Sequence, residues 1–292
     1  MRILVATDGS TDATAAIEWL ARRPLTVTAL RVLTVVTLPP SSIDIPTVRA
    51  YYQALRTGGE RLVEAGCHAL AASGPAVESQ VLEGDPRERI VEAAREWKAD
   101  LLVVGARGLG NLAGALLGSV STAVVRRARC PVLVIKGRLS ELRRAVVAVD
   151  GSKESLAAAR FLAALLLPRR MAIRLLAVLD LPPAMAPAGG LAPGVLTTPE
   201  ELFGERRATL EGVLSRVAAG LRTIANEVEC SVVVGRSAAE IVSAANEPGV
   251  GLVVVGARGL GRVRRWLLGS VSERVLLHAE CPVLVVPLPT AR

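Results

Sequence analysis

Short runs of β-branched and other apolar residues alternate along the chain with longer amphipathic stretches. In the first half, the strand-like runs are Ile3–Ala6, Thr26–Val36, Ala76–Leu82, Leu101–Val104 and Val132–Ile135, and the helix-like stretches are Asp12–Arg22, Val48–Ser73, Arg87–Trp97 and Ser119–Ala128. The second half repeats this pattern from Ala145 to Val286. Alternating strands and helices predict right-handed β-α-β crossovers, so the predicted fold class is α/β, with parallel sheets of about five strands. Helices cover both faces of such sheets.

An internal duplication spans nearly the whole chain. Met1–Ser10 returns as Arg144–Ser152, and Ala128–Ile135 returns as Ala279–Val286. A repeat of about 145 residues has the size of a domain and is far longer than the 20–50 residues of solenoid repeats. The sequence therefore predicts two similar domains in tandem.

The predicted domains are residues 1–137 and 143–288, each an open, doubly wound, Rossmann-like parallel sheet of about five strands. The halves differ mainly after their second strands, where the first has Leu38–Thr47 and the second has the longer, Pro-, Ala- and Gly-rich Leu181–Pro199. Each segment is interpreted either as a flap over a binding site or as a passive surface loop.

Composition narrows the class of protein. The chain has 292 residues, of which 51% are hydrophobic and 2% aromatic, so Val, Leu, Ile and Ala must fill its cores. Its apolar runs have the length of strands, and Met1 leads straight into one, which leaves no room for a signal peptide. Four widely spaced cysteines without a Cys-x-x-Cys pair argue against a metal site and a disulfide framework. We expect a cytoplasmic protein without membrane contact.

The net charge of +8 comes largely from arginine, which clusters at Arg126–Arg129, Arg138–Arg144 and Arg262–Arg265. Such clusters can contact nucleic acid, but no interleaved aromatic residues or recognised DNA- or RNA-binding motif accompany them. We interpret them as solvated helix faces and rims of phosphate-binding loops, and expect no nucleic-acid partner.

A glycine-rich phrase occurs once in each half. Gly105–Gly108 is followed, after nine residues, by Gly118–Ser121, and Gly256–Gly259 is followed at the same spacing by Gly269–Ser272. Glycine lets the backbone approach a ligand closely, and a helix that begins at the following serine attracts anions with its free amides. The phrase predicts a phosphate-binding loop in each half.

Asp8 and Gly105 each directly follow a predicted strand, as do Asp150 and Gly256. In open parallel sheets, ligands bind beyond the carboxyl ends of the strands where the strand order reverses, so each pair is expected at one crevice. The aspartate can accept hydrogen bonds from a ribose or an adenine amino group. Alternatively, Asp-Gly-Ser forms a turn and a helix N-cap, and Ser270–Glu273 forms a capping box.

Two other phosphate-binding motifs fail on inspection. The chain has no Gly-Lys-Ser/Thr and therefore no Walker loop. Gly108–Ala113 imitates a dinucleotide fingerprint, but Arg264 interrupts the second copy. The glycine loop also follows a late strand of its domain, whereas the dinucleotide fingerprint follows the first.

These motifs resemble those of the universal stress protein family, here as a tandem of two domains. Its nucleotide-binding members share a Gly-x2-Gly-x9-Gly-Ser/Thr loop, which both halves contain, and the resemblance extends to the opening Asp-Gly-Ser and closing Cys-Pro-Val segments. It implies one ATP per half, with Mg²⁺ held through the phosphates. It also implies that Val132–Ile135 and Val283–Val286 pair across the domains, and that the protein forms homodimers.

By this resemblance, the residues just before and at Asp8 and Asp150 line the base and adenosine, one valine per half packs on adenine, and the glycine loop holds ribose and phosphates. In the first half these residues are Ala6, Thr7, Asp8, Val35, Gly105, Arg107, Gly108, Gly110, Asn111, Gly118, Ser119, Val120 and Ser121. In the second they are Ala148, Val149, Asp150, Val178, Gly256, Arg258, Gly259, Gly261, Arg262, Gly269, Ser270, Val271 and Ser272.

No catalytic residue is assigned. His68 and His278 have no equivalent in the other half, and no general base or nucleophile is evident. Three functions remain open. The favoured one is an ATP-binding stress sensor that acts on a regulatory protein partner, and the alternatives are a weak ATPase and a nucleotide-free dimerising scaffold.

Overall fold

The computed structural model describes residues 1–22, 27–37, 46–71, 74, 76–109, 117–136, 142–165, 171–180, 199–260 and 268–288. The first half contains β1 (Arg2–Ala6), α1 (Thr11–Ala21), β2 (Ala29–Val36), α2 (Pro46–Leu70), β3 (Val77–Glu83), α3 (Pro86–Glu96), β4 (Leu101–Gly105), α4 (Ser119–Arg127) and β5 (Val132–Ile135). The second contains β6 (Arg144–Ala148), α5 (Lys153–Ala164), β7 (Ala172–Asp180), α6 (Pro199–Leu221), β8 (Glu227–Gly235), α7 (Ser237–Ala245), β9 (Val250–Gly256), α8 (Ser270–His278) and β10 (Val283–Val286).

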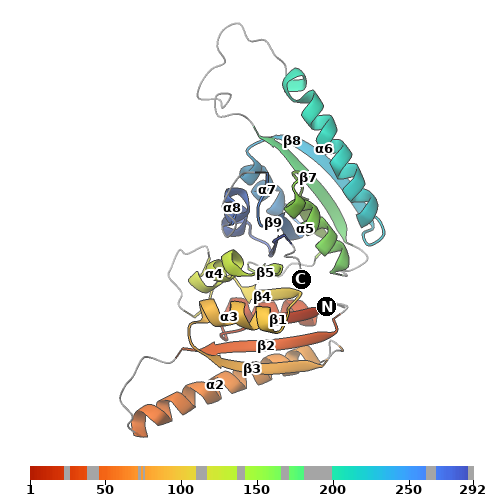
Figure 1. Ribbon diagram of the computed structural model, residues 1–292. Helices are drawn as coiled ribbons and strands as arrows, with labels where there is room; N and C mark the ends of the chain where they lie inside the picture. Colours follow the sequence, from red (N-terminus) through yellow and green to blue (C-terminus); the bar gives the residue numbers. More distant parts are fainter. Residues whose placement is uncertain are drawn as a thin grey trace.

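The strands form one ten-stranded sheet in the order β3-β2-β1-β4-β5-β10-β9-β6-β7-β8. Pairing is parallel within each half, and the halves meet where β5 and β10 pair antiparallel, with Val134 opposite Val283. Figure 1 shows the two halves joined at this central seam, with α2 and α6 at opposite ends. The predicted α/β class, the doubly wound parallel arrangement of each half and the pairing across the domains are confirmed, and this pairing joins the two five-stranded parts into one sheet.

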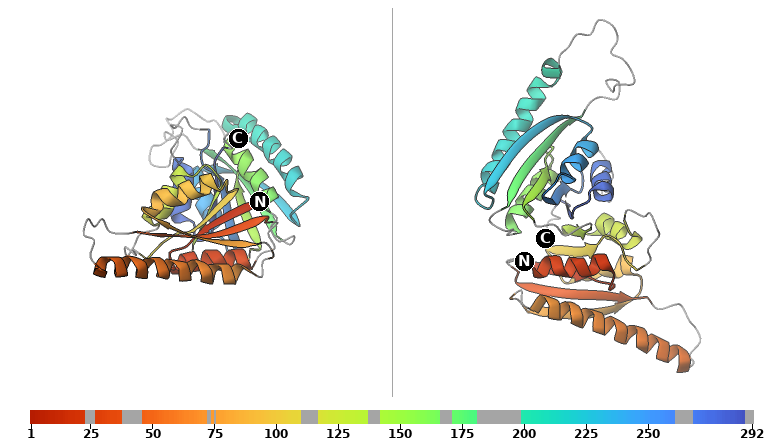
Figure 2. Two further views of the ribbon diagram at one scale, coloured as in Figure 1. Left: turned by 60° about the horizontal axis from the view of Figure 1, so that its bottom comes forward. Right: turned by 180° about the vertical axis from the view of Figure 1, so that it is seen from behind.

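Alternation along the strands divides the helices into two layers. Ile3 and Val5 pack in one cluster with residues of α1, α2, α5 and α6, whereas Leu4 and Ala6 pack in a second cluster with residues of α3, α4, α7 and α8. Successive strand side chains point to opposite faces, so a buried parallel strand must be apolar at every position. Each cluster contains residues of both halves, so the two domains share their cores. In the right-hand view of Figure 2, α6 lies on one side of the strands of the second half, and α7 and α8 lie on the other.

The segments interpreted as flaps or surface loops, Leu38–Thr47 and Leu181–Pro199, lie almost wholly outside the described residues. Among the described helices, even the long α2 and α6 lack an apolar stretch that could cross a membrane.

Lys136 follows β5 directly and is buried at the seam. Its Nζ donates to the carbonyl oxygens of Leu276 and Leu277, at 2.7 and 3.2 Å, in the last turn of α8. Burial lowers the pKa of Lys136 from 10.5 to about 8. A single first-half side chain thus satisfies carbonyls at the end of a second-half helix, where a cation also complements the helix dipole.

This burial predicts how stability depends on pH. Between about pH 8 and 10.5, the unfolded chain keeps a proton on Lys136 that the folded chain has lost, so stability rises with pH through this window. Relative to a Lys136→Met variant, we expect the free energy of unfolding of the native protein to rise by about 1–2 kcal/mol between pH 7.5 and 9.5. Urea unfolding at both pH values measures this difference, and parallel pH profiles would contradict it.

Candidate functional site

Asp8 follows β1 at the point where the strand order of the first half reverses, between β1 and β4. Its Oδ1 accepts the backbone N–H of Ser10 at 3.0 Å, and its Oδ2 accepts the N–H of Leu109 at 3.0 Å. The carboxylate therefore ties the end of β1 to the glycine loop after β4. Each oxygen keeps a further lone pair that a ligand donor can use.

Two positions of this loop must be glycine, because neighbouring atoms leave no room for a Cβ. A Cβ on Gly105 would lie 2.6 Å from the backbone nitrogen of Ala13 and 2.7 Å from the carbonyl carbon of Asp12, both in the first turn of α1. A Cβ on Gly108 would collide with Oδ2 of Asp8. These glycines let β4 and its loop pack directly against α1 and the aspartate.

The second half repeats the arrangement. Asp150 accepts the N–H of Ser152 at 2.9 Å and that of Leu260 at 3.1 Å. A Cβ on Gly256 would lie 2.9 Å from backbone atoms in the first turn of α5, and one on Gly259 would approach Oδ2 of Asp150. The same geometry thus occurs twice, as the duplication predicts.

The helices that follow the loops begin without a side-chain cap. Within the described chain, Gly118 at the start of α4 and Gly269 at the start of α8 provide no capping side chain, whereas Ser10 and Ser152 accept backbone amides in the first turns of α1 and α5. The first amides of a helix have no carbonyl partner inside it. The starts of α4 and α8 are therefore suited to bind an anion.

The serines at these helix starts divide into two kinds. The buried hydroxyls of Ser121 and Ser272 donate to the carbonyl oxygens of Gly105 and Gly256, at 2.6 and 2.7 Å. They fix the helix start to the end of the strand, so only their backbone amides remain for a ligand. The side chains of Ser119 and Ser270 are exposed and can turn toward one.

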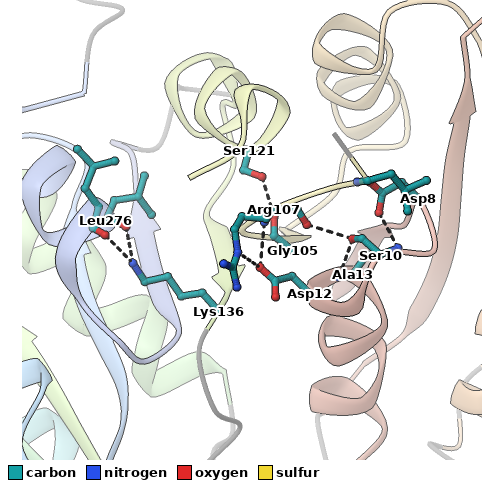
Figure 3. A network of polar contacts seen from close by, with 11 residues as sticks. Asp8, Ser10, Asp12, Ala13, Gly105, Arg107, Ser121, Lys136 and Leu276 are labelled. Carbon is teal, nitrogen blue, oxygen red and sulfur yellow. Dashed lines mark hydrogen bonds and ion pairs between the residues drawn. The ribbon is translucent and has the colours of Figure 1, made fainter. Parts of the chain in front are cut away.

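The two loop arginines contact acids that sequence reasoning did not assign to the site. Nε of Arg107 lies 3.2 Å from Oδ2 of Asp12, as Figure 3 shows, and a guanidinium nitrogen of Arg258 lies 3.2 Å from Oε1 of Glu154. Both acids lie in the first helical turn after Asp-Gly-Ser, where they favour the helix dipole. An acid at that position of both copies was the signal in the sequence.

The residues predicted to line the base lie at the carboxyl ends of the first two strands of each half. Ala6 and Val35 pack within one cluster on the α4 face of the sheet, and Ala148 and Val178 do so on the α8 face. Val120 of α4 and Val271 of α8, which were predicted to hold ribose and phosphates, pack against the same cluster. Thr7 is buried and continues the pairing of β1 with β2 by donating its N–H to Leu33.

Val149 departs from this group, because its side chain packs in the cluster on the opposite face of the sheet. Gly110, Asn111, Gly261 and Arg262 lie outside the described residues. Leu109 and Leu260 were not predicted, yet their amides bind the aspartates, and they are 73% and 65% exposed beside the loops. Their matching positions in both copies could have revealed them.

Known proteins resemble the chain in sequence and in fold. A model of the universal stress protein family matches residues 1–136 and 141–287. Universal stress protein Rv2005c from Mycobacterium tuberculosis is 32% identical over 302 residues, covering 97% of this chain and 96% of that protein. A universal stress protein structure from Archaeoglobus fulgidus aligns with a TM-score of 0.68 at 23% identity, covering 98% of this chain and 96% of that one, which shows the shared fold. A universal stress protein solved in complex with cAMP covers 46% of this chain and 96% of its own, at 29% identity and a TM-score of 0.36.

Proposed function

Because the chain belongs to the universal stress protein family, we propose that each half binds one ATP at its glycine loop and that the protein acts as a nucleotide-dependent stress sensor. The observation that carries the proposal is the repeated site geometry. In both halves, an aspartate ties the glycine loop to the first strand, and the helix after the loop begins with uncapped amides. Both copies have kept these groups, whereas other equivalent positions, such as Asp100 and Gly251, differ.

The phosphates would lie at the starts of α4 and α8. The amides of Ser119, Val120 and Ser121 have no intrahelical acceptor, and the partial positive charge of the helix start favours a polyanion. The exposed hydroxyl of Ser119 can add a hydrogen bond. Ser270, Val271 and Ser272 offer the same set in the second half.

Adenosine would lie beside the carboxyl ends of the first two strands. Ala6 and Val35 supply apolar surface on the α4 side, and Asp8 keeps lone pairs for a ribose hydroxyl or the adenine amino group. Ala148, Val178 and Asp150 provide the same groups in the second half. Mg²⁺ would be held through the phosphates.

The regulatory part of the proposal is supported by contacts between the two site helices. Arg126 of α4 forms an ion pair with Glu273 of α8, and Lys136 reaches the end of α8. A nucleotide that shifts α4 would therefore act on the helix that holds the other nucleotide. Differential affinity of ATP for two arrangements of the seam would expose or hide a surface for a regulatory partner.

We further propose that the protein is cytoplasmic and assembles as a homodimer. The seam between β5 and β10 uses one edge of each half within the chain, so a homodimer would use other surfaces such as the outer strands β3 and β8. The weak ATPase and the scaffold remain the alternatives to the sensor. Phosphate release during incubation with ATP distinguishes the ATPase, because a sensor without turnover releases none.

The first test is the nucleotide content of the purified protein. Freshly purified protein is denatured, and the released adenine nucleotide is quantified by chromatography and compared with the protein concentration. We expect bound nucleotide approaching two per chain if exchange is slow. If the purified protein carries no adenine nucleotide, and the protein stripped of nucleotide takes up none, the proposal is wrong and the scaffold is favoured.

A further inference from the structure

A cavity of about 920 Å³ lies at the seam, and none of its described lining residues belongs to either glycine loop. Its walls come from α3 and the end of α4 in the first half, and from α5 and the end of β10 in the second. This volume falls within the range of small-molecule sites, and the junction of two domains is a common place for them.

The walls of this cavity are strongly basic. Six of its lining residues are cations, namely Arg95, Lys98, Arg126, Arg127, Arg129 and Arg160, against the two carboxylates Glu92 and Asp100. Glu92 is already paired with Arg89 at 2.7 Å, and Asp100 accepts the N–H of Arg2 at 2.8 Å. The cavity therefore has a large excess of positive charge, which attracts anions.

Half of these cations have no protein partner in the described part of the chain. Arg126 pairs with Glu273, and Arg127 lies 3.6 Å from Glu88. The exposed side chains of Arg95, Lys98 and Arg160 form neither a hydrogen bond nor an ion pair with any described residue. Charges gathered around a cavity without acidic partners are available to a ligand.

The duplication provides an internal comparison, because every cation of the cavity has an equivalent position in the other half. The positions equivalent to Arg95, Lys98, Arg126, Arg127, Arg129 and Arg160 hold, in this order, Asn246, Gly249, Leu277, His278, Glu280 and Glu18. None is a lysine or arginine, and two are acidic. The basic cavity thus belongs to one side of the seam and is not a by-product of the duplicated fold.

The other side of the seam is occupied by protein. Lys136 is the equivalent of Pro287, and its ammonium is bound to the carbonyls of Leu276 and Leu277. On the cavity side, the short Pro287 sends no such side chain across the seam. The two sides of the seam have therefore diverged. On one side Lys136 closes the contact between the halves, and on the other the basic cavity stays open.

Lys98 lies on the cavity wall in a backbone conformation that favours glycine. It is the one described residue other than glycine with a positive φ, at 52°, and its equivalent in the second half is Gly249, with a φ of 85°. Glycine adopts this conformation without strain, whereas lysine does not. Lys98 lies just beyond the end of α3 in this conformation, so the first half carries a cation on the cavity wall where the second half has glycine.

We propose that this cavity binds a small molecule that carries several phosphate groups, as a second anion site separate from the glycine loops. A ligand with three or more negative charges matches the excess of cations in the cavity. Each guanidinium group can bind two phosphate oxygens at once. Because the walls come from both halves, the ligand would hold the seam in one arrangement. This proposal does not depend on ATP binding at the glycine loops.

The test is a calorimetric titration of inorganic tripolyphosphate into the full chain carrying Gly118→Glu and Gly269→Glu, which removes the glycine loops as competing phosphate sites. We expect one tripolyphosphate per chain. Arg95→Asn and Arg160→Glu introduce the residues that the other half has at the equivalent positions. Adding both substitutions should weaken tripolyphosphate binding about tenfold or more. A parallel titration with GTP distinguishes a nucleoside polyphosphate from an inorganic chain, because a contribution from the nucleoside would give GTP the higher affinity.

A Lys98→Gly variant separates a ligand role from a structural one. It relieves the positive φ and should raise the melting temperature by about 2 °C while weakening tripolyphosphate binding severalfold. The proposal is overturned if no tripolyphosphate binds, or if the variants at residues 95 and 160 or at 98 bind it as well as their parent does.

Discussion

Glutamate in place of Gly118 is expected to abolish nucleotide binding in the first half alone, and glutamate in place of Gly269 should do so in the second half alone. Each glycine begins the helix whose free amides would hold the phosphates, so the new carboxylate would occupy and repel the phosphate position. The expected loss of affinity is about 100-fold or more, since two like charges are brought together in a partly buried site.

Both variants should fold. The φ of Gly118 is −74° and that of Gly269 is −68°, values that any residue adopts, and an acid near a helix start favours the dipole. Equilibrium dialysis with labelled ATP should give half the native stoichiometry for each single variant and none for the double variant. Gly118→Ala is the matched control: its methyl group would lie 3.2 Å from the carbonyl oxygen of Ala106 but adds no charge, so it should keep more of the binding than Gly118→Glu. Native stoichiometry in the double variant would show that the loops do not hold nucleotide.

Alanine in place of Gly105 is expected to destabilise the first half severely, by about 3 kcal/mol or more. The new methyl group would lie 2.6 and 2.7 Å from backbone atoms in the first turn of α1, and backbone cannot move aside as a flexible side chain does. Separation of β4 from α1 would also disturb the contact of Arg107 with Asp12. The free energy of unfolding in urea measures the effect.

The chain offers a matched control in Gly58. This glycine is exposed on α2, and a Cβ there would meet nothing within 4 Å. Gly58→Ala should therefore stabilise the protein by about 0.5–1 kcal/mol, as expected for alanine in a helix interior. If Gly105→Ala were as stable as the native protein, the close approach of β4 to α1 would be wrong.

Most of the fold could be predicted because the information is local. The apolar runs give the strands, the amphipathic stretches give the helices, and the repeat of Met1–Ser10 and of the glycine phrase gives two domains. The tie between Asp8 and the loop also follows from local rules, since both follow parallel strands at the reversal of strand order.

What escaped prediction depends on contacts between distant segments. The buried contact of Lys136 with α8 joins residues far apart in the sequence, and no periodicity encodes it. The ion pair of Arg107 with Asp12 also joins distant residues, and its only signal is an acid at the equivalent position of both copies. From the sequence, Arg126–Arg129 were interpreted as part of solvated helix faces and rims of phosphate-binding loops. The cavity they line could not be foreseen, because its α5 wall belongs to the other half. The side chain of Val149 packs on the face opposite to that of Ala148, because neighbouring strand residues face opposite sides.

The central claim is that two similar sites in one chain each bind ATP. The most direct test is a calorimetric titration of ATP, with Mg²⁺ present, into protein freed of nucleotide by unfolding and refolding. We expect saturation at two ATP per chain, lowered to one by Gly118→Glu or by Gly269→Glu. A protein that refolds to its native circular dichroism spectrum and binds no ATP would contradict it, and the repeated glycine loops would then serve the fold alone.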